Sequence, residues 1–532
     1  MRSFGVRFLF AFVLMACSVV VAAEMPRLQK TAHGWQFLVD GKPFLMLGGQ
    51  VNNSSGWAAA LPDVWKTIET IHANTVEIPV YWENIEARRG QYRFGEVDHI
   101  VNWAREHDLR LVLLWFGSWK NGASNYVPLW VKQDRPHFPT MIDAAGNWTG
   151  VISPYFRSTL EADSQAFAAL MEHLKQTDGD RHTVILAQVE NETGSFGTPR
   201  DYSAEATRLF EGAAPEKLVA ALGKKPGTWR QVFGGEAEAF FAAWGFSTYV
   251  GEVAAAGKKV YPLPMYVNCW LAEGANFQRP GEDYPSGGPE PAMLAVWKAM
   301  APALDIVAPD IYLSSRQQYR EAMNAYRRPD NPMFIPETSY DGPAAQRLFE
   351  ALGEFGTIGF SPFGLDATGW TDTALAAVAD LAESYRLLGT MTAELSRWQA
   401  DGKLHSAVED YRKDFELLHL EQYDALVEFG RPNWGFGADP QATGGRVLIA
   451  EVGPAEFVLA GFNVRVSFRA RRGLPAPGQR KPGDGGRFFL VEEGRYQDGQ
   501  WKVRRPLNGD QTDFGLNLPK NGAVYRAVLE NY

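Results

Sequence analysis

The chain has 532 residues, of which 45% are hydrophobic and 21% are charged, values typical of a globular protein with an ample core. Its length predicts two to four domains, or one large barrel with an appendage. A net charge of −10 and an isoelectric point near 5.5 argue against nucleic acid or an anionic membrane surface as a partner.

Aromatic residues make up 13% of the chain, and 17 of them are tryptophans. This surplus is compatible with sugar binding, because pyranose rings present apolar faces that stack on indole and phenol rings. It is equally compatible with a Trp-rich core, which is the better interpretation for most of these residues. Composition alone therefore leaves a carbohydrate ligand open.

The N-terminal residues predict an export signal. Arg2 and Arg7 precede an apolar stretch over residues 8–21, and small residues at 21–23 precede Glu24. This order is typical of a secretory signal peptide that is cut after Ala23. No later segment reaches the ~18 uninterrupted apolar residues of a membrane span. We therefore expect residues 1–23 to be a signal peptide and the mature protein to be periplasmic or extracellular.

The two cysteines refine this expectation. Leu14 to Cys17 also resembles a lipoprotein cleavage box, an interpretation ranked second because cutting there leaves the apolar residues 19–23 near the new end. Cleavage after Ala23 leaves Cys269 as the only cysteine. The mature chain is then expected to have no internal disulfide and no cysteine-based metal site.

Apolar runs alternate with amphipathic helical stretches between residue 43 and about residue 365. In the helical stretches apolar residues recur at i, i+4 and i+7, as in Val64, Ile68 and Ile71. The runs predict strands at Phe44–Val51, Thr75–Trp82, Arg110–Gly117, Val184–Glu192, Pro264–Leu271, Asp305–Leu313, Pro332–Thr338 and Thr357–Gly364.

Eight near-continuous apolar strands, each followed by a helix, indicate parallel strands buried on both faces. Such units over some 320 residues fit a (β/α)8 TIM barrel, an α/β fold, with insertions. The alternative is an open doubly wound sheet, which usually carries a Gly-rich phosphate turn after its first strand, and none is evident. A helical stretch over about 373–398 closes this region, so the catalytic barrel is assigned to residues 24–398.

The C-terminal part, residues 399–532, has a different pattern. Short alternating runs at Arg446–Val452, Phe457–Phe468 and Arg487–Val491 are separated by Gly, Pro and Asp turns. This pattern predicts an antiparallel β-sandwich. The segment Arg471–Gly486 is dense in Gly and Pro and predicts a loop.

Two glutamates end the fourth and seventh predicted strands of the barrel. Because the carboxyl ends of barrel strands face one pocket, Glu192 and Glu337 are expected on opposite sides of it. Glycoside hydrolysis uses such a pair: one carboxylic acid protonates the leaving oxygen, and the other attacks the anomeric carbon or activates water. A separation of ~5–5.5 Å makes the second acid a nucleophile and retains the anomeric configuration. The Asn191 amide can bind the sugar 2-hydroxyl.

Each glutamate taken alone is as well explained by a salt bridge at a strand end. The strand context, the preceding Asn191 and the matching acid on another strand favour the catalytic interpretation for Glu192 and Glu337 together. Glu190 points to the opposite face of its strand from Asn191, so it is expected to be structural.

Three motifs resemble those of glycoside hydrolase family 35 β-galactosidases, which belong to a retaining clan of (β/α)8 barrels. The chain resembles the family's opening in FLVDGKPFLMLGGQVNN and its second-strand signature in NTVEIPVYWENIEARRGQYRF. QVENETG resembles its acid/base motif. The resemblance covers most of the barrel and implies Glu192 as acid/base, Glu337 as nucleophile and Glu86 as a ligand of the sugar hydroxyls.

The sequence departs from that family in two places. The third-strand signature is replaced by LVLLWFGSWKNGASNYVPLWVK, which is closer to family 42 β-galactosidases. Ser339 stands where a Tyr usually follows the nucleophile, and Tyr340 comes one residue later. The C-terminal runs resemble an uncharacterised β domain of bacterial relatives, some of which are linked to removing galactose from xyloglucan side chains.

Other residues at the strand ends are candidates for substrate binding. Tyr312 either binds the nucleophile or ring oxygen, or is a buried tyrosine bonded to the backbone, and Asp310 and Asp366 can anchor loops. Of the tryptophans after the third strand, Trp130 is expected to pack the loop. The substrate-binding candidates are Asn191, Glu86, Gln50, Trp82, Trp115, Trp119, Asn268, Trp270, Tyr312 and Tyr340.

We therefore expect a retaining exo-β-galactosidase that releases terminal galactose from plant-type oligosaccharides. The alternatives are another β-glycosidase of the clan, acting on β-arabinosides or β-glucosides, and a catalytically silent carbohydrate-binding barrel. The nine histidines show no metal-ligand spacing, and the two-carboxylate mechanism requires neither a metal nor an organic cofactor.

Overall fold

A computed structural model describes residues 24–272, 278–340, 342–366, 372–410, 414–430, 443–471 and 486–530. The predicted signal peptide, residues 1–23, lies outside the described residues, as does most of the predicted loop between Arg471 and Gly486. No helix in the described part of the chain is both long enough and apolar enough to span a membrane.

The predicted barrel is confirmed. Eight strands close on themselves in the order β10-β11-β12-β13-β4-β5-β6-β9, and every pair that is assigned a register runs parallel. The barrel strands are β4 (Met46–Gln50), β5 (Thr75–Tyr81), β6 (Arg110–Lys120), β9 (Val184–Asn191), β10 (Met265–Trp270), β11 (Ile306–Ile311), β12 (Ile335–Thr338) and β13 (Gly359–Pro362).

These strands are apolar because both of their faces are covered. All residues of β5 and of β9 are buried, whether they point into the barrel or toward the helices. Side chains inside the barrel, such as Val112, Leu114 and Phe116 of β6, pack in one cluster, whereas Leu111 and Leu113 pack outward with the helices. The strands therefore read as continuous apolar runs.

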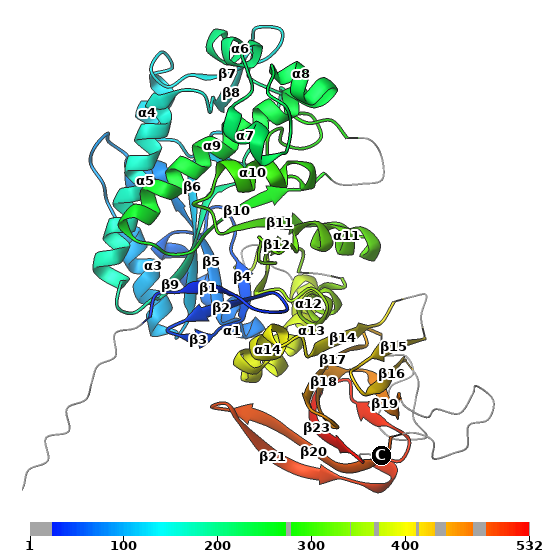
Figure 1. Cartoon of the computed structure of the whole chain (residues 1–532). Helices are drawn as coiled ribbons and strands as arrows, with labels where there is room; N and C mark the ends of the chain where they lie inside the picture. Colours follow the sequence, from blue (N-terminus) through cyan, green and yellow to red (C-terminus); the bar gives the residue numbers. More distant parts are fainter. Residues whose placement is uncertain are drawn as a thin grey trace, which may run out of the picture.

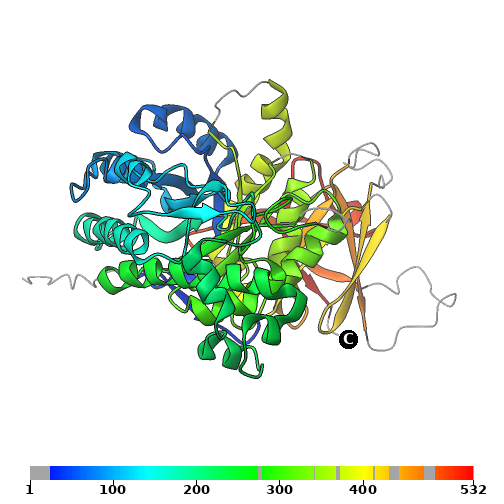
Figure 2. The same cartoon turned by 90° about the horizontal axis from the view of Figure 1, so that it is seen from above.

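Helices surround the strands when the molecule is seen from above (Figure 2). An insertion between β9 and β10 adds several helices to the side of the barrel that carries α5 (Figure 1). The α-helices are α1 (Leu61–Ile71), α2 (Trp82–Ile85), α3 (Gly95–Glu106), α4 (Leu129–Gln133), α5 (Arg157–Asp178), α6 (Ala204–Glu211), α7 (Glu216–Ala221), α8 (Trp229–Phe233), α9 (Ala237–Val260), α10 (Leu294–Met300), α11 (Arg316–Tyr326), α12 (Ala344–Gly353), α13 (Asp372–Leu388) and α14 (Thr392–Ala400).

A small sheet packs against the amino-terminal end of the barrel. It is formed by β1 (Arg27–Lys30), β2 (Trp35–Val39) and β3 (Lys42–Pro43) in antiparallel order. Phe37 and Val39 of β2 pack with Met46 and Phe334 in the interior cluster of the barrel. This end is therefore filled with apolar side chains.

A hairpin of β7 (Thr140–Ile142) and β8 (Trp148–Ile152) precedes α5.

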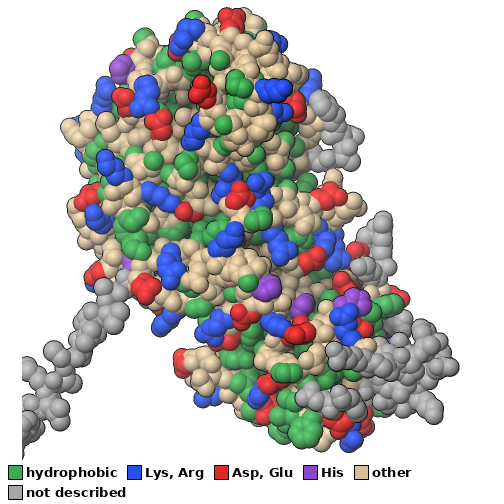
Figure 3. Space-filling view, viewed as in Figure 1, with side chains coloured by type: hydrophobic (Ala, Val, Ile, Leu, Met, Phe, Trp, Pro, Cys, Tyr) green, Lys and Arg blue, Asp and Glu red, His purple; other side chains and the backbone are tan. Residues whose placement is uncertain are grey.

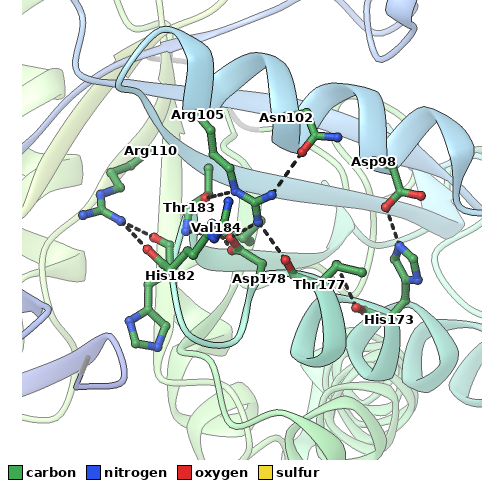
Figure 4. A network of polar contacts seen from close by, with 11 residues as sticks. Asp98, Asn102, Arg105, Arg110, His173, Thr177, Asp178, His182, Thr183 and Val184 are labelled. Atoms are coloured by element: carbon green, nitrogen blue, oxygen red, sulfur yellow. Dashed lines mark hydrogen bonds and ion pairs between the residues drawn. The ribbon is translucent and has the colours of Figure 1, made fainter. Parts of the chain in front are cut away.

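A polar network at the same end joins α3 to α5 and to the start of β9 (Figure 4). The buried Asp178 carboxylate lies 2.6 Å from Nη2 of Arg105. It also accepts hydrogen bonds from the backbone N–H groups of Thr183 and Val184 at 3.1 and 2.7 Å. Arg105 also donates a hydrogen bond to the backbone carbonyl of Thr177. Every oxygen of this buried acid therefore has a donor.

The C-terminal part contains two antiparallel sheets, as predicted. The six-stranded sheet is formed by β14 (Leu404–Val408), β17 (Arg446–Gly453), β18 (Glu456–Phe462), β20 (Phe488–Gln497), β21 (Gln500–Leu507) and β23 (Ala523–Leu529). The four-stranded sheet is formed by β15 (Phe415–His419), β16 (Tyr423–Phe429), β19 (Val464–Ala470) and β22 (Leu516–Leu518). Side chains of both sheets share one apolar cluster, which includes Ile449, Leu459, Val427 and Val466.

The predicted run Phe457–Phe468 is not one strand. It divides at Asn463, whose φ of 51° lies in the left-handed region, into β18 and β19. These two strands belong to different sheets. Asparagine adopts this conformation more readily than most residues, so the chain can cross from one sheet to the other there.

Arg446 joins the C-terminal sheets to the barrel helices. Its guanidinium is almost fully buried, lies 4.1 Å from the ring centroid of Phe462, and donates to the backbone oxygen of Asp380 and the hydroxyl of Ser384 on α13.

The face of the molecule in Figure 3 shows acidic and basic side chains interspersed.

Candidate active site

The carboxyl ends of the barrel strands bring three acids together. One carboxylate oxygen from each of Glu192, Asp310 and Glu337 lies within 4.8 Å of the other two. The acids follow β9 or lie in β11 and β12, and each is at most 5% exposed. The structure therefore places the two glutamates that the sequence paired in one site and adds a third acid between their strands.

Glu337 is held at both of its oxygens. Gln50 Nε2, at the end of β4, donates to Oε2 at 2.8 Å, and the Tyr312 hydroxyl, after β11, donates to Oε1 at 2.7 Å. Hydrogen bonds from two neutral donors leave the negative charge on the carboxylate while fixing its direction. Of the two interpretations of Tyr312, the structure supports the one in which it binds Glu337.

Glu192 follows a strained turn of the backbone. Its φ is 44° and that of Glu190 is 63°, both in the left-handed region that non-glycine residues seldom adopt. The Glu192 backbone N–H donates to Oδ1 of Asn268 at 2.8 Å. Nζ of Lys120 lies 4.0 Å from Oε2 of Glu192. Backbone strain of this kind persists where surrounding contacts hold it, and it is concentrated at functional sites.

Asp310 is the acid that the sequence analysis did not include among the site residues. Asn268 Nδ2 donates to its Oδ2 at 2.6 Å, so Asn268 links Asp310 to the backbone of Glu192. Burial raises the pKa of the Asp310 carboxyl well above its usual range, and the charges of Glu337 and Glu192 raise this pKa further. The available signal was that Asp310 stands two residues before Tyr312 within the predicted strand Asp305–Leu313, because such residues share a face.

Asn191 is fully buried, and neither Oδ1 nor Nδ2 of its side chain has a hydrogen-bond partner. An unsatisfied buried amide costs free energy, so native proteins rarely keep one without a reason. A ligand hydroxyl in the site can satisfy both atoms. This agrees with the role predicted for Asn191 from its position beside Glu192.

A second layer of buried polar groups lies deeper in the barrel. Glu77 of β5 accepts a hydrogen bond of 2.8 Å from the Tyr266 hydroxyl of β10. Burial raises the pKa of Glu77 to about 8, and the charge of Glu337 adds to the increase. Glu77 is therefore neutral over most of the physiological range.

Two of the predicted sugar-stacking tryptophans lie outside the barrel. Trp115 is 1% exposed and donates to Asp163 of α5 at 2.9 Å. Trp119 is fully buried and packs edge-on against Tyr249 of α9, with ring centroids 4.5 Å apart. Neither ring has a free face for a sugar, so the prediction is wrong for both. They instead anchor β6 to its covering helices.

Glu190 lies in the same outer layer. Its Oε2 accepts the Trp119 backbone N–H at 2.7 Å. Burial raises the pKa of Glu190 well above its usual range, and the neighbouring Asp163 raises this pKa further. The side chain therefore faces the helices rather than the pocket, as the alternation of the strand predicted.

Glu86 and Trp82 form a closed contact after β5. Trp82 is fully buried and donates from Nε1 to Oε2 of Glu86 at 2.9 Å, while the Gly90 N–H donates to Oε1 at 2.6 Å. The Trp130 indole donates to the Glu86 backbone carbonyl. Both Glu86 oxygens accept hydrogen bonds within the turn, and the predicted contacts of Glu86 and Trp82 with a sugar stay a prediction. Trp130 packs the loop, as expected.

Trp270 and Tyr340 keep part of their surface exposed. Trp270 ends β10, and its ring lies edge-on to Phe196 with centroids 5.5 Å apart. Tyr340 follows β12 and is half-buried at the edge of the core. Their predicted contact with substrate stays a prediction. Asp366 anchors a loop, as expected, because it accepts hydrogen bonds from Asn52.

A closed parallel barrel with two acids facing each other at its carboxyl end is an arrangement found in (β/α)8 glycoside hydrolases. Residues 36–255 match the model of Glycosyl hydrolases family 35, which confirms the resemblance over this part of the chain. Glu192 lies within the matched residues, whereas Glu337 lies beyond them. Residues 381–519 match a domain of unknown function, DUF5597.

Curated relatives are similar over the same part of the chain. A beta-galactosidase of Xanthomonas manihotis is 26% identical over 215 residues, 38% of this chain and 33% of that protein. Beta-galactosidase 8 of Oryza sativa subsp. japonica is 23% identical over 211 residues, 36% of this chain and 28% of that protein. The chain thus matches about a third or less of the length of these relatives.

Solved structures with a similar course of the chain include two beta-galactosidases. That of Bacillus circulans sp. alkalophilus has a TM-score of 0.48 and 15% identity, covering 66% of this chain and 57% of that chain. That of the psychrophilic Marinomonas ef1 has a TM-score of 0.46 and 13% identity, covering 66% of this chain and 61% of that chain.

Proposed function

We propose that this protein is a retaining exo-β-galactosidase in which Glu192 is the acid/base and Glu337 the nucleophile. The observation that carries the proposal is the approach of Glu192 and Glu337, whose carboxylate oxygens lie within 4.8 Å at the mouth of the barrel. This approach of one oxygen from each acid is compatible with the ~5–5.5 Å between the carboxyl groups of retaining enzymes and supports that class over inverting enzymes, which keep the groups about 6.5–9.5 Å apart to admit a water.

The contacts of Glu337 support its role within the pair. Gln50 and Tyr312 donate to both oxygens of Glu337 and fix its direction, so Glu337 is suited to attack the anomeric carbon as a carboxylate. As the bond from Glu337 to C1 forms, Glu192 gives its proton to the glycosidic oxygen and the leaving group departs. Glu192 then takes a proton from water, which attacks C1 and releases the sugar from Glu337. Asn191 is placed to bind the 2-hydroxyl, where the contact strengthens in the transition state.

Galactose is proposed from the similarity to relatives that are described as beta-galactosidases. The polar residues around the acids fit a hexose without naming its epimer. Release of galactose from xyloglucan side chains, in the periplasm or outside the cell, extends the proposal on the basis of the domain arrangement and the predicted signal peptide. β-Glucoside and β-arabinoside hydrolysis, and carbohydrate binding without catalysis, are outcomes that the experiment separates.

The experiment is a panel of nitrophenyl glycosides with the purified full chain. We expect turnover of the β-galactoside and, by NMR, release of β-galactose as the first product. Glu337→Ala should lose almost all activity, and azide should restore part of it by occupying the vacated space and attacking C1. The matched control is Glu394→Ala on α14, because Glu394 is 5% exposed, as Glu337 is. Turnover of only β-glucosides or β-arabinosides would overturn the galactose assignment, and release of α-galactose would overturn the retaining mechanism.

A further inference from the structure

The third acid of the site raises a question of charge. Glu192, Asp310 and Glu337 approach one another within 4.8 Å, and each is buried. Like charges at this distance in a poorly solvated site cannot all be ionised, so protons must be retained on part of the cluster. A retaining mechanism needs one ionised acid at each stage: Glu337 before the sugar is attached, and Glu192 afterwards.

The surroundings of Asp310 show where a proton is retained. Asn268 donates to its Oδ2, whereas no donor reaches the buried Oδ1. One oxygen of Asp310 lies within 4.8 Å of an oxygen of Glu192 and of Glu337. Burial raises the pKa of the Asp310 carboxyl well above its usual range, and Glu337 and then Glu192 raise it further. Lys120 acts in the opposite direction. The described titratable groups that interact electrostatically with the acids of this site include Lys120, Glu77, Tyr266, Tyr312, Tyr326 and Cys269.

We propose that Asp310 is a positioning residue that remains protonated through both steps of the reaction and hydrogen-bonds to the Glu192 carboxylate when that acid is ionised. The inference rests on the proposed function, because it concerns the same two glutamates. It goes beyond that function by giving the site a third acid that neither attacks the sugar nor exchanges its proton with it.

The charges balance through the reaction. Before attack, Glu337 is ionised and Glu192 and Asp310 each carry a proton. Bond formation from Glu337 to C1 neutralises Glu337 as an ester, and Glu192 becomes ionised when its proton passes to the leaving oxygen. The cluster therefore keeps one negative charge, which moves from Glu337 to Glu192, while Asp310 stays neutral.

Lys120 is the counterion of that single charge. Its side chain is 6% exposed, and its Nζ lies 4.0 Å from the Glu192 carboxylate. The ammonium also lies 5.3 Å from the ring centroid of Phe116, which keeps it within the barrel mouth. A positive charge here favours the ionised form of Glu192, the form that activates water in the second step.

The test is the pH profile of kcat/KM for Asp310→Asn. The Asn amide can still accept from Asn268 and donate to Glu192, so we expect activity within about tenfold of the native protein. The basic limb reports loss of the Glu192 proton. An amide N–H is a weaker donor to a carboxylate than a carboxyl O–H, so this limb should stay in place or move up by less than about one pH unit.

The sign of that shift decides the matter. If Asp310 were ionised in the native protein, Asp310→Asn would remove a neighbouring negative charge, and the basic limb would move down by about one unit or more. A downward shift therefore overturns the proposal, as does a loss of activity in the folded variant as large as that of Glu192→Gln. Lys120→Met should move the basic limb up by about one unit, because Glu192 loses its counterion.

A matched control is Asp163→Asn. Asp163 is equally buried and burial raises the pKa of its carboxyl, but it lies outside the barrel beside Glu190. Its substitution should leave the pH profile unchanged. A shift of the basic limb by about one pH unit or more in Asp163→Asn would show that the limb does not report the charge beside Glu192, and would overturn the assignment to Asp310.

A measurement without substrate keeps the inference separate from the proposed function. Infrared spectra of the Asp163→Asn protein, labelled with carbon-13 in its aspartates, should show the stretching band of a protonated carboxyl at pH 7, and Asp310→Asn should remove it. The expected band does not depend on which glycoside the protein hydrolyses. If the Asp310→Asn variant does not fold, the spectrum of the Asp163→Asn protein alone still tests whether a protonated carboxyl is present. Absence of the band overturns the inference, whereas its presence in a protein that turns over no glycoside overturns only the proposed function.

Discussion

The two ends of the barrel bury acids in opposite ways. At the amino-terminal end Asp178 receives a guanidinium and two backbone N–H groups, so its charge is matched and its geometry fixed (Figure 4). At the carboxyl end three acids face one another, and only Lys120 approaches the cluster with an opposite charge at 4.0 Å among the described residues. The first arrangement stabilises the fold, whereas the second concentrates charge where a substrate can use it.

This contrast predicts that substitutions at the two ends will separate activity from stability. Neutralising an acid at the mouth removes a function and relieves repulsion between like charges. Neutralising Asp178 at the base leaves the partly buried Arg105 without its carboxylate partner. The predictions below follow this difference, from the largest expected effect to the smallest.

Glu192→Gln should have the largest effect, and it should depend on the leaving group. For a β-galactoside with an alkyl or sugar leaving group we expect kcat/KM to fall about a thousand- to ten-thousand-fold, because such groups need a proton to depart. For a dinitrophenyl galactoside, whose leaving group needs none, attachment of the sugar should continue, and azide should speed its release.

The matched control for that prediction is Glu190→Gln two residues earlier. Glu190 is as buried as Glu192 but faces the helices, and a glutamine can still accept the Trp119 N–H. Its kinetics should match those of the native protein. An equal loss on all substrates in Glu192→Gln would contradict the role of Glu192 as the acid.

Asp178→Ala should unfold more easily without losing the site. Removing one member of a buried ion pair typically lowers the free energy of unfolding by about 3–5 kcal/mol. We expect this loss in urea unfolding, with kcat per folded molecule unchanged at low temperature. Asp98→Ala removes the partner of His173 in the same network, but Asp98 is 44% exposed, so the loss should be about 1 kcal/mol or less. Similar losses of unfolding free energy in Asp178→Ala and Asp98→Ala would contradict the conclusion that the buried Asp178 stabilises the amino-terminal end of the barrel.

The pH dependence of stability provides a third test through Glu77. Burial raises the pKa of Glu77 in the folded chain to about 8 from its ordinary value of 4.5, so the folded protein holds a proton that the unfolded chain releases. Stability from this group is complete below pH 4.5 and is lost as the pH rises through about 8. Between these limits the slope should reach about 1.4 kcal/mol per pH unit.

Glu77→Gln keeps an acceptor for Tyr266 and cannot ionise, so its stability should vary less between pH 5 and pH 8 than that of the native protein. Glu69→Gln on the exposed side of α1 serves as the control and should keep the native slope. Chemical unfolding at several pH values measures both. An unchanged slope in Glu77→Gln would show that Glu77 is ionised in the folded protein.

The sequence predicted the barrel and the meeting of Glu192 with Glu337 because both follow from one rule. Parallel strands buried on both faces read as apolar runs, and their carboxyl ends share one mouth. For the same reason, the sequence does not predict whether a single side chain points into the barrel or toward the helices, since both faces of a strand such as β6 are apolar. Trp115 and Trp119 were therefore assigned to the pocket although they point to the helices.

The departures near the site have local physical causes. β6 shifts its register relative to β9 between Trp115 and Lys120. Trp115 and Trp119 nevertheless keep the alternation of Leu111 and Leu113 and pack outward with them. The Trp82–Glu86 contact spans one helical turn, so these two residues of the signature hydrogen-bond to each other. Asp310 was overlooked because an acid at a strand end is as easily a loop anchor, and only the strands' closure brings it to the glutamates.

Chelation should have the smallest effect. Three acids within 4.8 Å have the spacing of a cation site, and oxygen ligands of this kind suit Mg²⁺ or Ca²⁺. However, Gln50 and Tyr312 already occupy both oxygens of Glu337, Asn268 binds Asp310, and Lys120 supplies a positive charge beside Glu192. We therefore expect kcat to change by less than about twofold after dialysis against EDTA or on addition of either ion. A larger loss of activity that one divalent ion restores would mean that a bound cation balances the acids at the mouth, as Arg105 balances Asp178 at the base. The proposal that Asp310 stays protonated and Lys120 is the counterion would then be wrong.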